Sequence, residues 1–201
     1  IDYLSVISPQ AYQKGNTLYM TGGYGYETMT GLFNTKPVLT AINLPGLVQW
    51  VQEPSNSNHS VSANIRQMTD PLFQISGGEM YSLGNITQLI FGQNFTGVYD
   101  PGTSGQYSKQ IRQFQILDKG GQLAVHPLNP VPLSPDPSYR RRDLNILPVL
   151  LNKNNTLTNG LVAYSGVFTE SSGAWTVPVI INDQGQPSMA DPFSPTTFKQ
   201  G

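Results

Sequence analysis

Three stretches of this 201-residue sequence resemble one another, and their spacing constrains the fold more than any other feature. GNTLYMTGGYG begins at residue 15 and GNITQLIFGQNF begins at residue 84, a separation of 84 − 15 = 69 residues. A third copy, GLVAYSGVFTE, begins at residue 160. Each copy is a run of β-type residues that reaches a glycine. Self-similarity at such a period indicates a repeat architecture, in which each unit packs against its neighbours.

The segments around each copy repeat as well. A candidate strand precedes each glycine run, and a second β-type run follows it, at 36–46, 108–120 and 176–185. Each unit then ends in a short segment with a proline: LVQWVQEP, QLAVHPLNP and QPSMADP. Period-two alternation and frequent Pro and Gly disfavour helix, except for a possible turn in SANIRQM (62–68). We therefore predict four short strands per unit, in units 1–57, 58–133 and 134–193, with 194–201 beginning a further unit.

Tandem four-stranded units are typical of a β-propeller, in which each unit is a blade. We predict an all-β segment of about three blades; a β-sandwich or barrel is the alternative. Because a propeller needs about four to eight blades to close, we expect a larger ring of six or seven blades. The remaining blades would come from the same protein or from a second copy. Uncovered end blades expose apolar faces and strand edges, so we expect this span to be stable only with such a partner.

The glycines after the second strand of each unit have a structural interpretation. Gly22, Gly23, Gly92 and Gly166 lie where neighbouring blades converge, and a missing Cβ allows close approach there. The run TLYMTGGYG, with Trp50 downstream in LVQWVQEP, resembles the kelch repeat. The resemblance implies a propeller of the galactose-oxidase central-domain type. The copper site of such oxidases needs a Cys cross-linked to a Tyr, and the chain has no Cys, so we expect no copper site and no cofactor.

Composition limits the partners. The net charge is −1, from 11 Lys and Arg against 12 Asp and Glu, so no bulk field attracts nucleic acid or an anionic membrane. No apolar run approaches the roughly 18 residues of a membrane span. We expect neither nucleic-acid binding nor membrane insertion. A charged fraction of only 11% is common in extracellular proteins, and it favours a secreted, periplasmic or cell-surface protein.

Two groups of residues are candidates for ligand binding. Three loops occupy the same place in successive units, at 23–34, 94–107 and 168–175, and their aromatic and amide side chains suit a carbohydrate or peptide surface. The run SYRRRDLN either forms an anion pocket or pairs between blades. The candidate ligand-binding residues are Tyr24, Tyr26, Asn94, Tyr99, Arg141, Arg142, Asp143 and Trp175.

These features favour a binding or scaffold module that recognises protein or carbohydrate, over an enzyme. We assign no catalytic residue and no metal ligand, because His59 and His126 are isolated and the acids are scattered. The alternatives are a sugar-modifying propeller enzyme, such as a sialic acid mutarotase, and a propeller lectin. Arg66, Arg141 or Arg142 converging with a Glu and a His on one pocket would favour the enzyme. Arginines paired between blades would favour the scaffold.

Overall fold

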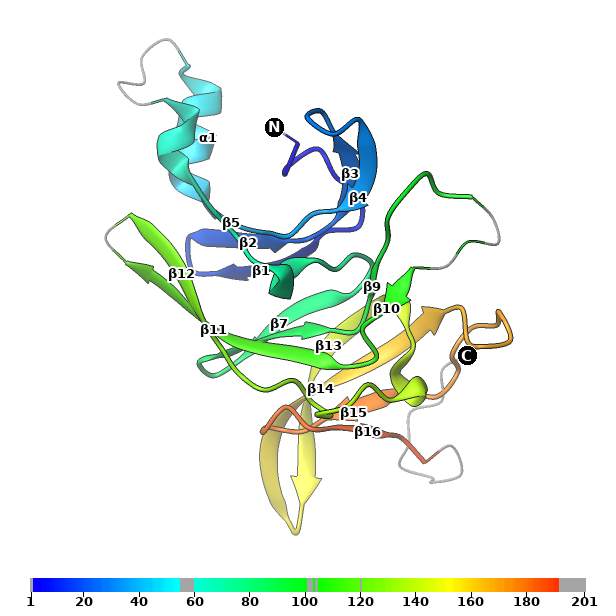
Figure 1. Ribbon diagram of the computed structural model, residues 1–201. Coiled ribbons are helices and arrows are strands. Elements are labelled where there is room, and N and C mark those ends of the chain that lie inside the picture. The colour runs from blue at the N-terminus through cyan, green and yellow to red at the C-terminus, as the bar shows by residue number, and fades with distance from the viewer. Residues whose placement is uncertain (1, 55–59, 101–102, 104, 120, 192–201) are drawn as a thin grey trace.

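A computed structural model describes residues 2–191 except 55–59, 101–102, 104 and 120 (Figure 1). The described residues form three four-stranded antiparallel sheets, two two-stranded sheets and one α-helix. These sheets confirm the prediction of an all-β propeller segment. The segment 194–201, expected to begin a further unit, lies outside the described residues.

Each large sheet is a meander in which chain neighbours pair. The first sheet holds β1 (Gln10–Lys14), β2 (Thr17–Thr21), β5 (Val38–Asn43) and β6 (Ile65–Thr69). The second sheet holds β7 (Glu79–Leu83), β8 (Ile86–Ile90), β11 (Ile111–Lys119) and β12 (Gln122–Pro127). The third sheet holds β13 (Arg142–Lys153), β14 (Thr156–Val167), β15 (Val179–Ile181) and β16 (Pro187–Met189). This repeated order is the blade topology of a propeller.

An insertion separates the second and third strands of each sheet. In the first sheet it is the hairpin of β3 (Tyr24–Glu27) and β4 (Leu32–Thr35), and in the second it contains β9 (Gln93–Asn94) and β10 (Gln106–Tyr107). In the third it is the stretch 168–178. These insertions contain the three loops predicted to carry ligand-binding residues.

Short 3₁₀ helices precede strands in each repeat. They are η1 (Val61–Asn64), η2 (Pro71–Phe73) and η3 (Pro137–Tyr139). The last two begin alike, because Asp70 accepts a hydrogen bond from the Leu72 amide at 2.7 Å and Asp136 accepts one from the Ser138 amide at 2.9 Å. The same cap therefore leads the chain into the second and third sheets.

The segment LVQWVQEP, expected to be the fourth strand of the first unit, instead falls largely in helix α1 (Leu44–Gln52). The helix starts because the Asn43 side chain caps the Gly46 amide and Pro45 supplies a favourable first turn. The fourth strand is β6, which pairs with β5 and lies beyond residue 57, where the first unit was predicted to end. Trp50 lies in α1, so it does not occupy the strand position of the kelch pattern.

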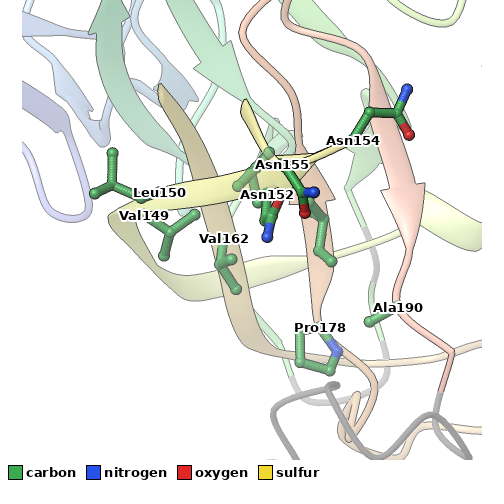
Figure 2. Close-up of a pocket in the computed structure, with 10 residues that line it drawn as sticks. Val149, Leu150, Asn152, Asn154, Asn155, Val162, Pro178 and Ala190 are labelled. Carbon is green, nitrogen blue, oxygen red and sulfur yellow. The ribbon is translucent and has the colours of Figure 1, made fainter. Parts of the chain in front are cut away.

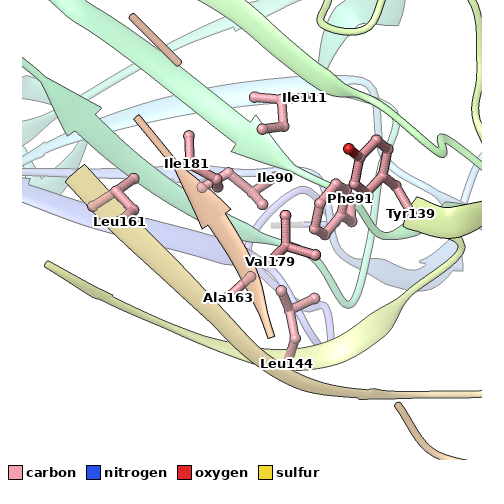
Figure 3. Packing of buried hydrophobic residues seen from close by; sticks show 9 residues of the cluster. All are labelled: Ile90, Phe91, Ile111, Tyr139, Leu144, Leu161, Ala163, Val179 and Ile181. Atoms are coloured by element: carbon pink, nitrogen blue, oxygen red, sulfur yellow. The ribbon is translucent and has the colours of Figure 1, made fainter. Parts of the chain in front are cut away.

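The second sheet packs against the first sheet with one face and against the third with the other. Leu89 and Phe114 join the cluster with Leu39 of the first sheet, whereas Ile90 and Ile111 join the cluster with the third sheet (Figure 3). Adjacent residues of β8 thus point to opposite faces, as period two requires. The innermost strands also adjoin, β1 to β7 and β7 to β13. The sheets are therefore stacked in series rather than as two facing layers.

Backbone hydrogen bonds join neighbouring sheets at their inner ends. The Gly23 amide donates to the Ile75 carbonyl at 3.0 Å, and the Gly92 amide donates to the Arg141 carbonyl at 2.8 Å. Alignment of the glycine runs on their strands places Gly22 on Gly92 and Gly166. That alignment is wrong by one residue in the first unit, because Gly23 is the structural counterpart of Gly92. A second set joins the starts of the innermost strands. The Gly77 amide donates to the Ser8 carbonyl at 3.1 Å, and the Asp143 amide donates to the Gly77 carbonyl at 2.6 Å. We call these four the cross-sheet hydrogen bonds.

Substitution of Gly22 by Ala tests the close approach of the first two sheets. A Cβ at Gly22 would lie 1.9 Å from the Ile75 carbonyl oxygen, whereas a Cβ at Gly15 meets nothing within 4 Å. Both residues have left-handed backbones, with φ of +64° and +58°. Each Ala variant should lose about 1–2 kcal/mol for that conformation, and Gly22→Ala should lose about 1–3 kcal/mol more for overpacking. Urea unfolding measures both, and equal losses would contradict the stated approach.

Candidate functional site

The insertions of the first two sheets pack against each other and are joined by hydrogen bonds. The Thr35 amide donates to the Phe95 carbonyl at 2.9 Å, and the Phe95 amide donates to the Thr35 hydroxyl at 2.8 Å. The Tyr24 ring stacks on Phe33 with centroids 5.8 Å apart and meets the edge of Phe95 at 5.5 Å. The Tyr24 hydroxyl donates to the Gly97 carbonyl. Both loops are therefore held in fixed positions beside the start of β13.

Arg142, the first residue of β13, lies between aromatic rings from two insertions. Its guanidinium carbon is 4.7 Å from the Phe168 ring centroid and 5.8 Å from that of Tyr99. Nη2 donates to the Tyr99 hydroxyl at 3.3 Å, and Nη1 lies 3.3 Å from the Asp143 carboxylate. Burial opposes the charge of Arg142, but the hydrogen bonds to Tyr99 and Tyr107 and the nearby Asp143 carboxylate raise its pKa overall. Nε is buried with no hydrogen-bond partner among the described atoms.

Two cavities meet at Arg142. The first, which we call the polar lobe, has a volume of about 280 Å³, and the second, the apolar lobe, about 230 Å³. The lobes share Gln93, Tyr99 and Arg142. The polar lobe is further lined by Thr103, Tyr107, Arg140, Phe168, Thr169, Glu170 and Ser172. The apolar lobe is further lined by Ile7, Ser8, Tyr24, Ser76, Gly77, Phe95 and Asp143.

Charged side chains of both signs line the polar lobe. Two arginines and one carboxylate line it, and the Arg140 guanidinium lies 4.0 Å from the Tyr107 ring centroid and donates to the Thr169 carbonyl at 3.1 Å. The cation–π contact with Tyr107 and the hydrogen bond to Thr169 hold Arg140 in place, and Arg142 is paired with Asp143. Two guanidinium groups held at one cavity can bind an anionic group.

Arg141, one of the predicted ligand residues, belongs to the interior, and Trp175, another of them, packs against it half-buried. Arg141 is fully buried, and its guanidinium donates to the carbonyls of Ser165 at 3.1 Å and Val177 at 2.8 Å. The Trp175 ring packs 4.5 Å from that guanidinium and donates from Nε1 to the Arg140 carbonyl at 2.7 Å. Burial lowers the pKa of Arg141 to about 10. Both side chains stabilise the third sheet beneath the site and present no surface to the two lobes.

The remaining predicted residues are distributed as follows. Tyr24, Tyr99, Arg142 and Asp143 come together around the apolar lobe. Tyr26 lies on the β3–β4 hairpin, 47% exposed, with its ring against Phe33 and outside both lobes. Asn94 pairs with Gln106 between β9 and β10, next to the shared Gln93. The structure thus gathers half of the eight candidates at one cavity.

Sequence reasoning missed several lining residues. Arg140 was within the quoted SYRRRDLN run, and Glu170 within the third loop, but neither was singled out. Ile7 and Ser8 are far from the other residues in the chain and reach the site only because the N-terminal segment pairs with β3, through the Ile7–Tyr24 bridge. No local pattern in the sequence marks them.

Of the arginines named as a test for an enzyme, Arg142 meets Glu170 at the polar lobe, but no described histidine lines that lobe. Arg66 pairs with Asp118 between the first and second sheets, at 2.7 Å, and the Tyr19 hydroxyl donates to the same carboxylate. His126 lies on β12 and lines neither lobe, and His59 is outside the described residues. Within the described part of the chain, no group of three His, Asp or Glu side chains could hold a metal ion.

The architecture and the site together define a β-propeller segment whose insertions line a cleft of two lobes. No family model matches the chain, and no curated protein matches it. One solved structure, titled "Structure of YjhT", matches at 12% sequence identity with a TM-score of 0.38, covering 98% of this chain and 73% of that chain. The fold assignment rests on the sheet topology and not on this similarity. Among the described residues, none of the helices is long and apolar enough to cross a membrane.

Truncation of Arg141 to Ala tests its structural role. We expect the free energy of unfolding to fall by about 2–4 kcal/mol, because the charged hydrogen bonds to two carbonyls disappear and a cavity remains, while relief of desolvation offsets part of the loss. Lys153→Ala, at the exposed end of β13, should change it by about 0.5 kcal/mol or less. Urea unfolding of both variants is the measurement; an unchanged midpoint for Arg141→Ala would contradict the role.

Proposed function

We propose that the chain is a non-catalytic ligand-binding module of a secreted or surface protein, and that its two-lobed cleft binds an acidic carbohydrate. The observation that carries the proposal is the position of Arg142. Its guanidinium lies at the junction of both lobes, is oriented by Asp143 and Tyr99, and keeps a buried Nε without a described partner. A guanidinium held in this way is suited to a carboxylate.

The rings beside Arg142 support a sugar rather than a bare anion. Tyr99 is 50% exposed and Phe168 is 36% exposed, and both line the polar lobe. Flat apolar ring faces stack against the C–H faces of a sugar, and neighbouring hydroxyl groups supply hydrogen bonds. Thr103, Thr169 and Ser172 provide such hydroxyls in the same lobe. The combination fits one sugar ring that carries a carboxylate.

The choice of a binding module over an enzyme rests on the scarcity of acid–base groups. Glu170 is the carboxylate of the polar lobe, and no described histidine lines it. A sugar-modifying enzyme, such as a sialic acid mutarotase, remains the second candidate, supported by Glu170 in the same lobe as Arg142. Recognition of a protein ligand by the exposed aromatic residues is a third candidate.

The proposal also includes a kelch-like identity for the repeats, which the glycine pair after β2 supports.

The test uses a pair of probes that differ in one charge. Glucuronic acid should bind, and glucose should bind at least about tenfold more weakly, because a hydrogen bond to a charged group contributes about 1.5–3 kcal/mol. Arg142→Ala should weaken glucuronic acid binding about 10- to 100-fold and leave glucose binding unchanged. Isothermal titration calorimetry measures both.

Lys153→Ala is the matched control, because it removes one exposed positive charge from the far end of the same strand. It should leave both affinities as they are. Equal affinity for the two probes, or an Arg142→Ala variant that binds glucuronic acid normally, would overturn the proposal. Turnover of an acidic sugar that depends on Glu170 would favour the enzyme instead.

A further inference from the structure

The three sheets use equivalent rows of residues to face the next sheet in the stack. Aligning Gly23 with Gly92 and Gly166 and following the strand registers defines one cross-strand row in each sheet. The rows are Tyr12, Tyr19 and Ala41; Tyr81, Gln88 and Gln113; and Leu147, Val162 and Ile180. The correspondence holds at every strand pair, so the third row should face a fourth sheet.

The first two rows are in contact with the following sheet. Tyr19 and Ala41 are part of the apolar cluster shared with the second sheet, and Tyr12 packs against it. Tyr81 packs against the cluster shared with the third sheet, and a Cβ at Gly185, in the β15–β16 turn, would lie 2.2 Å from Gln113 and 2.5 Å from Gln88. These rows therefore are the existing interfaces between sheets.

The third row borders an open apolar groove. Val162 and Ile180 line a cavity of about 710 Å³ together with Pro178, Ala190 and the projecting β13–β14 hairpin (Figure 2). Leu147, the counterpart of Tyr12 and Tyr81, is 52% exposed and Ile180 is half-buried, whereas Val162 is 1% exposed within one copy. An apolar sheet face of this kind marks an interaction surface.

The face of the first sheet that points away from the second sheet is only partly covered. Its row Ala11, Met20 and Thr40 corresponds to Met80, Leu89 and Arg112 of the second sheet. Met80 and Leu89 are 2% and 0% exposed because the first sheet covers them, whereas Ala11 is exposed, Met20 is half-buried and only Thr40 is buried, at 1%. Leu4, in the segment that leads into the first sheet, is 37% exposed.

We infer that the open face of the third sheet binds the first sheet of a second copy of this chain, continuing the existing interfaces. Two copies would then provide six sheets, a number within the range of about four to eight that closes a propeller. The cross-sheet hydrogen bonds would continue as well. The Ser8 amide of the second copy would donate to the Asp143 carbonyl, and the Gly166 amide would donate to the Val6 carbonyl of the second copy. The contact is head-to-tail. The third sheet of each copy packs against the first sheet of the other, so two such contacts close the ring.

Light scattering coupled to size-exclusion chromatography tests the inference on the 201-residue chain. We expect a mass twice the 22.0 kDa of one chain. Leu147→Glu should yield a folded species of 22.0 kDa, because the side chain is already half-exposed in one copy and would be buried in the pair. Leu117→Glu, at a 48% exposed position of the second sheet, should leave the dimer intact. A monomeric parent chain, or a dimer that both or neither substitution dissociates, would overturn the inference.

Discussion

The structure depends on how closely each sheet approaches the next at its inner end. At these inner ends the two sheets meet through backbone atoms, and an amide of one sheet donates directly to a carbonyl of the next. Such bonds require residues with left-handed backbones, which Gly23 and Gly92 adopt with φ of +82° and +84°. The apolar clusters farther out add hydrophobic stabilisation. Because that stabilisation has no preferred direction, the backbone hydrogen bonds set the geometry between sheets.

The same inner bonds position the candidate site. The Asp143 amide is tied to the Gly77 carbonyl, so the start of β13 is fixed relative to the second sheet, and Arg142 is fixed one residue before it. The insertions leave the sheets next to these bonds and bring the rings of Tyr99 and Phe168 close to the guanidinium. A site built from three insertions on a rigid stack gains precision that a single loop would not have.

The repeat in the sequence predicted the four-stranded units and the places of the insertions, because strand periodicity and turn residues are local signals. It did not predict α1, where the capping Asn43 and Pro45 outweigh a β-type composition. Nor could it separate Arg141, which is buried, from Arg142, which lines the cleft. Asp143 has a φ of +54°, which interrupts the alternation of side chains at the start of β13. Spatial neighbours such as Ile7 depend on tertiary pairing that no short pattern encodes.

Amide hydrogen exchange followed by NMR tests the central claim most directly, because it reads the cross-sheet hydrogen bonds one residue at a time. The account predicts slow exchange for the amides of Gly23, Gly77, Gly92 and Asp143, comparable to that of the central amides of β8 and β11. Fast exchange at these four positions in a chain whose strands remain protected would contradict the claim that the backbone joins one sheet to the next.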